Sequence, residues 1–238
     1  MEKFSQWLKE SNHTVIFTGA GMSTESGLPD FRSKTGLWKQ KDPTKLASTT
    51  ALTHYREDFY AFYKTRIEAL QQVEPHAGHQ EIAHWEKKGL LQSIITQNVD
   101  GLHQKAGSKN VAELHGNLTS LRCHDCGRQE SMDLYLQDKT TCQTCGGFLR
   151  PNVVLFGEML PEEAIITAET ETNQAELFIV LGSSLTVTPA ATFPQIAKQN
   201  GATLVIINQE KTPLDTIADL VIHDKKIGEA LTETAQYL

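Results

Sequence analysis

Four cysteines occupy one short stretch of the chain as two spaced pairs, Cys123 with Cys126 and Cys142 with Cys145, in the pattern C-x2-C-x15-C-x2-C. Each pair aims two thiolates at one ion, and four thiolates complete a closed tetrahedral zinc site. Neither a redox pair nor unpaired core cysteines accounts for two spaced pairs. With sulfur in every coordination position, no place is left for water or substrate, so we expect one structural, redox-silent Zn²⁺.

A second stretch suited to chemistry is TGAGMSTESGLPDFR, from Thr18 to Arg32. It opens with Gly19, Ala20 and Gly21 after an apolar run, like a dinucleotide-binding loop, but Thr24 replaces the third glycine of G-x-G-x-x-G. Its backbone N–H groups suit a pyrophosphate, Arg32 suits bidentate pairing with it, and Phe31 suits the face of a flat ring. Taken alone, the loop also fits a tight turn without a ligand.

Buried strands must position these residues. Five runs rich in Val and Ile lack polar alternation and predict strands covered on both faces: 14–21, 92–98, 176–184, 203–208 and 219–224. Segments with helical periodicity lie between them, at 76–89 and 189–201. This alternation predicts an α/β fold, a Rossmann-like doubly wound parallel sheet, whose ligands bind at the carboxyl ends of the strands. Polar or glycine-rich clusters follow four of these strands and together predict one cleft.

Two stretches interrupt the alternation. Residues 33–75 look largely helical, and residues 117–152 contain the cysteines. We expect this helical insertion and this zinc-binding module to form a second, smaller domain. Residues 1–32, 76–116 and 153–238 would then form the Rossmann-like, nucleotide-binding domain.

Six motifs occur in the order expected of a sirtuin: the loop from Thr18, TQNVDGLH (96–103), LHG (114–116), the cysteine quartet, RPNVVLFGE (150–158) and GSSLTVTP (182–189). The chain closely resembles this family, the NAD-dependent protein-lysine deacylases, from about Val15 to Asn208. The resemblance implies an enzyme that moves the acyl group of an acylated lysine to ADP-ribose and releases nicotinamide. Its partners would be acylated-lysine proteins, with NAD as co-substrate.

The resemblance also implies roles for the polar strand ends. His115 would be the base acting on a ribose hydroxyl, which suits a neutral imidazole near pH 7. The loop would hold the pyrophosphate and nicotinamide ribose, with Phe31 shielding the reacting carbon. The remaining contacts implied for NAD are Gln97 and Asn98 at the ribose and nearby water, Val99 and Asp100 at the carboxamide, Gly182, Ser183, Ser184 and Asn208 at phosphate and adenosine ribose, and Ile227 at the adenine. The alternative for each is ordinary capping of a strand end, and His103 is expected only to pack in a helix.

The acyl-peptide would lie between RPNVVLFGE and GSSLTV as an added strand. Val154, Phe156 and Gly157 would wall the lysine tunnel, or be plain core. In 58–72, an apolar helical stripe (Phe59, Phe62, Tyr63, Ile67, Leu70) carries Arg66 near its middle. An arginine there needs an anion, from a protein carboxylate or a ligand, unless it reaches solvent.

Tyr63 and Arg66 match the Tyr-x-x-Arg of sirtuins that remove succinyl, malonyl or glutaryl groups, and Ala47 matches their small acyl-pocket residue. Asp30 departs from that pattern, since those relatives have threonine there. The resemblance therefore implies acidic acyl groups as accepted substrates beside acetyl.

Composition narrows the classes of function that remain possible. The 22 Lys and Arg against 29 Asp and Glu give a net charge of −7, which argues against a nucleic-acid backbone binder. No apolar run reaches the roughly 20 residues of a membrane span, and no secretory signal is evident, so we expect a cytoplasmic, membrane-free protein, monomeric in the simplest case. Two alternatives stay open: a protein ADP-ribosyltransferase using the same cleft, and a zinc-ribbon binding or NAD-sensing module without turnover.

Overall fold

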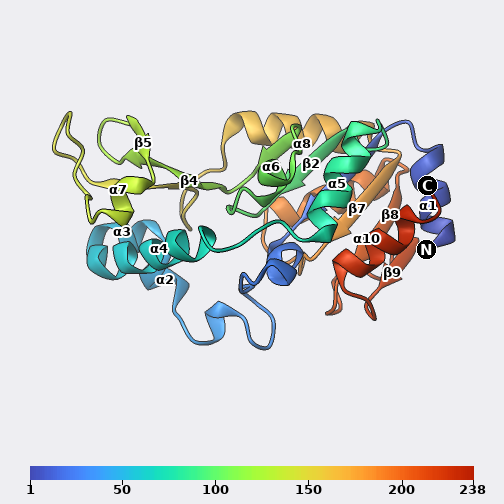
Figure 1. Ribbon diagram of the computed structural model, residues 1–238, viewed down its shortest axis with the longest axis horizontal. Helices are drawn as coiled ribbons and strands as arrows, with labels where there is room; N and C mark the ends of the chain where they lie inside the picture. The colour runs from blue at the N-terminus through green and yellow to red at the C-terminus, as the bar shows by residue number, and fades with distance from the viewer.

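The structure is a computed structural model that describes residues 1–238. It contains two separate sheets, a large parallel one and a small antiparallel one, which occupy opposite ends of an elongated molecule (Figure 1). The predicted α/β class with a second, smaller domain is therefore confirmed. The limits of the two domains stay a prediction.

The large sheet has six strands in the order β3-β2-β1-β7-β8-β9, and every neighbouring pair is parallel. Five of the strands coincide with the predicted runs, and the edge strand β3 was not predicted. Their bounds are β1 Thr14–Thr18, β2 Ser93–Thr96, β3 Val111–Glu113, β7 Leu177–Leu181, β8 Thr203–Ile207 and β9 Leu220–Ile222. Because chain order reverses between β1 and β7, a crevice opens there at the carboxyl ends of the strands.

Helices cover both faces of this sheet, as the absence of polar alternation in the strands requires. On one face, strand residues such as Ile16 and Ile179 pack against α1 (Glu2–Glu10), α5 (Ala77–Lys87) and α10 (Ile227–Ala235). On the other face, Val15 and Phe178 pack against α8 (Glu162–Gln174) and α9 (Phe193–Gln199). The short helix α6 (Leu102–Ala106) packs beside α5. The two sides of β1 are thus buried by opposite layers, with Ile16 on one side and Val15 and Phe17 on the other.

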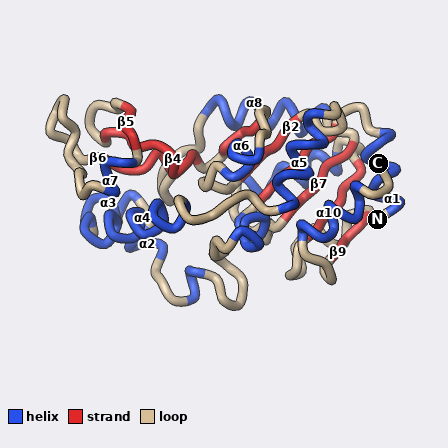
Figure 2. Tube along the Cα trace, viewed as in Figure 1, coloured by secondary structure: helices blue, strands red, loops and turns tan.

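The small sheet has the order β5-β4-β6, with β4 (Gly116–Cys123) antiparallel to both β5 (Gln129–Ser131) and β6 (Leu149–Val153). A helical layer packs beside it, as Figure 2 shows, and consists of α2 (Pro43–Leu46), α3 (Thr49–His54), α4 (Arg56–Leu70) and α7 (Asp133–Leu136). All five members of the predicted apolar stripe on α4 are buried: Phe59, Phe62, Tyr63, Ile67 and Leu70. The insertion and the cysteine module therefore share one hydrophobic core.

Three short 3₁₀ helices complete the chain: η1 Ala20–Ser26, η2 Leu37–Lys39 and η3 Ala190–Thr192. The two termini lie together at the end of the molecule farthest from the small sheet (Figure 1), where α1 packs on α10 and Lys9 Nζ donates to the carbonyl oxygen of Tyr237. No helix combines the length and apolar character that crossing a bilayer requires.

Candidate active site

One cavity of about 1710 Å³ opens at the carboxyl ends of the strands and extends between the two sheets. Every site residue predicted from the sequence, apart from the four cysteines, lines this cavity. They are Gly19, Ala20, Gly21, Thr24, Phe31, Arg32, Tyr63, Arg66, Gln97, Asn98, Val99, Asp100, His115, Val154, Phe156, Gly157, Gly182, Ser183, Ser184, Asn208 and Ile227. Segments distant in the sequence thus meet at one place.

The loops after β1 and β7 interlock through glycines at the topological switch point. The N–H of Gly21 donates to the carbonyl oxygen of Gly182 at 2.8 Å, and Gly182 has φ +62°. A Cβ on Gly19 would lie 2.8 Å from that oxygen, and one on Gly182 would lie 2.2 Å from the nitrogen of Met22. Only glycine permits this approach. The close packing usually served by a third loop glycine occurs here between two loops, so Thr24 is free to donate to the carbonyl of Gly21 at 2.8 Å.

A buried polar network joins two of the lining residues, Asn98 and Asp100, to Ser23. The side-chain amide of Asn98, 7% exposed, donates to the carbonyl of Gly19 at 3.0 Å and to Ser23 Oγ at 3.2 Å. Ser23 Oγ in turn donates to Asp100 Oδ2 at 2.8 Å, and burial raises the pKa of Asp100. Ser23 was missed by the sequence analysis because an isolated serine in a loop carries no distinguishing pattern. It links the first loop to the 97–100 cluster.

His115 stands between the two halves of the cavity, next to the start of β4. Its Nδ1 lies 3.0 Å from the carbonyl oxygen of Gln97, which can only accept, so Nδ1 carries the proton. The unprotonated Nε2 then holds the lone pair. Burial lowers the pKa of His115 below its ordinary value. The imidazole is therefore a neutral base of fixed tautomer at pH 7.

Ser183 and Asn208 line the cavity at the ends of β7 and β8. Gln97 Nε2 donates to Ser183 Oγ at 2.8 Å, and this bond ties the loops after β2 and β7 together. Asn208 Nδ2 donates to the carbonyl of Glu210 at 2.6 Å, and Ile227 begins α10. Glu25 and Lys226, which were not predicted, also line this part of the cavity, and the carboxylate of Glu25 accepts from the N–H of Gly228 at 2.9 Å.

Aromatic rings surround Arg66, and burial lowers its pKa, whereas the carboxylate of Asp100 acts on that pKa in the opposite direction from longer range without forming an ion pair. Its guanidinium carbon lies 5.0 Å from the Phe31 ring centroid and 5.6 Å from that of Phe62, and Arg66 takes part in no ion pair. Burial raises the pKa of the neighbouring Tyr63 to about 12, so its hydroxyl stays a hydrogen-bond donor. This end of the cavity presents a cation and a donor to an anion.

Asp30, the departure noted in the sequence, shapes the loop that carries Phe31. Its Oδ1 accepts from the backbone N–H groups of Arg32 at 3.1 Å and Ser33 at 2.9 Å, which is the local turn that an aspartate favours. The Phe31 ring stacks on Trp38, with ring centroids 5.1 Å apart. Asp30 thus has a role in the turn and does not block the acyl end.

The segment Val154–Gly157 forms the opposite wall. The N–H of Val154 donates to the carbonyl of His115 at 2.8 Å, and the N–H of Phe156 donates to that of Ala47 at 2.9 Å. The Phe156 side chain is 46% exposed, which is unusual for a phenylalanine and excludes a role as plain core. Gly157 makes no backbone hydrogen bond within the protein and has φ +95°.

The four cysteine sulfurs lie within 4.8 Å of one another, outside the cavity. Cys123 and Cys142 are buried in the small-domain core, whereas Cys126 and Cys145 are exposed. Four thiols at this separation fit the tetrahedral donor set of zinc, and their distance from the cavity agrees with a structural role.

The chain is similar to known proteins over most of its length. A family model described as the Sir2 family matches residues 19–189. An NAD-dependent protein deacetylase 1 of Geobacillus kaustophilus is 57% identical over 98% of this chain and 97% of its own length. An NAD-dependent protein deacetylase of Oceanobacillus iheyensis is 58% identical over 94% of this chain and 95% of its own.

Solved structures agree with the sequence relatives. A Sir2 variant in complex with a deacetylated p53 peptide and 3′-O-acetyl-ADP-ribose superposes with a TM-score of 0.93. That chain is 40% identical, and the match covers 99% of this chain and 97% of that one. The similarity thus extends over both sheets and the cavity between them.

Proposed function

The chain belongs to the Sir2 family, and from this premise we propose that it is an NAD-dependent protein-lysine deacylase that transfers the acyl group to ADP-ribose and releases nicotinamide. One observation carries the proposal: the residues implied for NAD, for the base and for the acyl-lysine line a single cavity. A non-catalytic zinc module would need no such convergence.

The loop after β1, together with the Gly182 loop, would hold the diphosphate of NAD. Gly19, Gly21 and Gly182 keep these backbones free of side chains, so a phosphate can approach closely, and Arg32 adds a cation at the far end of the loop. When bound, NAD supplies an anomeric carbon with nicotinamide as its leaving group. Asn98 and Asp100, held by Ser23, would orient the ribose and the carboxamide.

His115 would remove the proton from a ribose hydroxyl at Nε2. The bond from Nδ1 to the Gln97 carbonyl fixes the ring and keeps Nε2 free to accept. As the proton arrives, the same bond stabilises the imidazolium, because the donating N–H becomes more acidic. Phe31 would shield the reaction from water, since its ring lines the cavity and is held there by stacking on Trp38.

The acylated lysine would enter along Val154–Gly157, where the unpaired backbone of Gly157 offers a peptide strand both a donor and an acceptor. At the end of this path we propose that Arg66, with Tyr63, accepts an acyl group that carries a carboxylate. The support is that Arg66 lines the cavity and forms no ion pair within the protein, since Asp100 acts on it only from longer range. Acetyl-lysine would fill the same path without that contact.

The first test is turnover of an acetyl-lysine peptide with NAD, followed by mass spectrometry of peptide and nucleotide products. We expect free lysine, nicotinamide and O-acetyl-ADP-ribose in equal amounts. The matched control is the same peptide with unmodified lysine, which should release no nicotinamide. Nicotinamide release that is independent of the acyl group, with ADP-ribose attached to protein, would instead support an ADP-ribosyltransferase.

A further inference from the structure

Arg150 is the most deeply buried charged side chain of the molecule, with 0% of its surface exposed. It lies on β6 in the small sheet, outside the main cavity lining. A buried guanidinium is costly unless it is paired and hydrogen-bonded throughout. The assigned roles of the RPNVVLFGE segment do not use this residue, although the segment begins with it.

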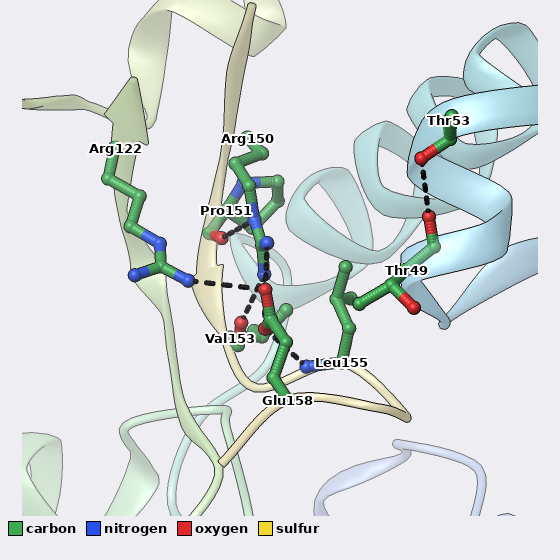
Figure 3. A network of polar contacts seen from close by, with 8 residues as sticks. All are labelled: Thr49, Thr53, Arg122, Arg150, Pro151, Val153, Leu155 and Glu158. Atoms are coloured by element: carbon green, nitrogen blue, oxygen red, sulfur yellow. Dashed lines mark hydrogen bonds and ion pairs between the residues drawn. The ribbon is translucent and has the colours of Figure 1, made fainter. Parts of the chain in front are cut away.

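The partner of Arg150 is the last residue of the same segment. Arg150 Nη1 donates to Glu158 Oε1 at 2.5 Å and Nη2 donates to Glu158 Oε2 at 3.0 Å, as Figure 3 shows. This bidentate pair is among the strongest side-chain contacts available to a protein. It joins the two ends of the segment from 150 to 158.

Both partners also hold the backbone between them. Arg150 Nη2 donates to the carbonyl of Val153 at 2.6 Å, and Glu158 Oε2 accepts from the N–H of Leu155 at 2.8 Å (Figure 3). Burial works against ionisation of Glu158, but the bonds from Arg150 and Leu155 outweigh it and hold the pKa of that carboxyl below its ordinary value. The pair is therefore charged at neutral pH.

The residues enclosed by these contacts are those that face the cavity. Val154 is bonded to the carbonyl of His115, and Phe156 is bonded on both sides to the chain at Ala47 and Thr49. Gly157, directly before Glu158, keeps its backbone groups unpaired. The ion pair thus fixes the one stretch that connects the base, the helical layer and the open edge of the cavity.

We propose that Arg150 and Glu158 are positioning residues that hold Val154–Gly157 in the conformation to which the acyl-peptide strand adds. The proposal rests on the proposed peptide edge. Neither residue touches reacting atoms. A preformed edge lowers the ordering cost of binding, so loss of the pair acts on peptide affinity.

The test is steady-state kinetics of Glu158→Gln, which keeps the size of the side chain but removes its charge. We expect the KM for an acetyl-lysine peptide to rise about tenfold, while kcat and the KM for NAD stay within about twofold, since only preorganisation of the edge is lost. The matched control is Arg122→Gln. The Arg122 side chain approaches the same carboxylate at 3.6 Å but donates to no backbone group of the segment, so the KM of this variant for peptide should stay unchanged.

A second variant guards against loss of folding. Arg150→Lys keeps the charge but not the two-pronged donor, so it should also raise the KM for peptide selectively. If kcat and the folded fraction fall in both variants, and the KM for NAD changes as much as the KM for peptide, the pair is only structural and the proposal is overturned.

Phe156→Ala separates this proposal from the one on which it rests. If Phe156→Ala raises the KM for peptide and Glu158→Gln does not, the edge stands and the positioning role is wrong. If neither variant changes that KM, the peptide does not bind along Val154–Gly157 and both assignments are wrong.

Discussion

The Nδ1 of His115 lies 3.0 Å from the carbonyl oxygen of Gln97, so one strand-end residue sets the tautomer of the base while its own side chain bonds Ser183. The backbone of His115 in turn accepts from the N–H of Val154. The imidazole is thus connected to both proposed substrate sites through main-chain atoms. Its orientation is a property of the fold around it.

The pH dependence of turnover should follow from this environment. The pKa of His115 is lowered by burial, so the neutral, proton-accepting form persists below the ordinary value of 6.5. We expect kcat/KM to stay level down to about pH 6.5 and to fall at lower pH. His115→Ala should lower kcat about 100-fold or more on the level part of the profile, since a general base contributes about 10² to 10⁴ in rate. An acid limb centred above pH 7 would contradict the assignment.

Gly182→Ala should disrupt the switch point. Its φ of +62° strains any other residue, and the added Cβ would lie 2.2 Å from the nitrogen of Met22. We expect a loss of about 3 kcal/mol or more in the free energy of unfolding, together with loss of NAD binding. The control is Gly201→Ala, which has φ +98° but open space, and should cost about 1 kcal/mol. Urea unfolding and NAD titration calorimetry measure both, and equal effects in the two variants would exclude the interlock.

Arg66→Met tests acyl selectivity. Loss of a charge-assisted contact should lower kcat/KM for a succinyl-lysine peptide about 10- to 100-fold and leave that for acetyl-lysine within about threefold. Arg56→Met is the matched control, because Arg56 also lies on α4 and over an aromatic ring, that of Phe148, yet outside the cavity. Equal decline on both peptides would make Arg66 a structural residue.

Zinc loss should unfold the small domain. Cys123 and Cys142 belong to the core that also contains Phe62 and Tyr63 of α4, so the acyl end of the cavity depends on that core. Cys142→Ser should cost more than about 4 kcal/mol of stability and abolish activity. Thr144→Ala, within the same knuckle but not a ligand, should do neither. Zinc content, thermal unfolding and turnover are the measurements, and full activity in a verified metal-free protein would refute the dependence.

Two buried histidines in edge-to-face contact should make the fold sensitive to acid. His79 and His103 are buried with ring centroids 4.9 Å apart, and burial lowers the pKa of His79 to about 2 and that of His103 to about 3. The unfolded chain binds these protons near pH 6.5, so stability is complete above that pH and declines below it, by about 1.4 kcal/mol per histidine per pH unit. His79→Leu should reduce the slope of unfolding free energy against pH, and the exposed His84→Ala should not. Identical slopes in the wild type and in His79→Leu would show that the buried histidines are not the cause of the acid sensitivity.

The sequence predicted the central strands because runs such as Val15–Phe17 and Phe178–Val180 are apolar on both faces. It missed β3, since Val111–Glu113 is a three-residue edge strand with no apolar run of its own. The stripe on α4 was predicted from period alone, and all its members are buried. Long segments with a clear hydrophobic period can be recognised from their own residues. A short edge strand forms only because a neighbouring strand pairs with it, so its own residues do not reveal it.

The site residues likewise fall into those that the sequence reveals and those whose roles depend on the folded structure. The loop glycines were recognisable by type and spacing, and His115 by its match to the sirtuin LHG motif; all of them line the cavity. Ser23 and the pair Arg150–Glu158 were not assigned, because their roles depend on contacts formed only after folding. The tautomer of His115 is likewise set by a backbone carbonyl, which no side-chain pattern reveals.

The meeting of the two chain ends beside α1 and α10 has a practical consequence. A tether attached at Met1 or Leu238 leaves from the end opposite the small sheet (Figure 1), so an immobilised molecule would present its small domain away from the support. Bulky substrate proteins would then still reach Val154–Gly157, even when the support is crowded with tethered molecules. The arrangement suits fusion to a targeting partner at either end without obstruction of catalysis.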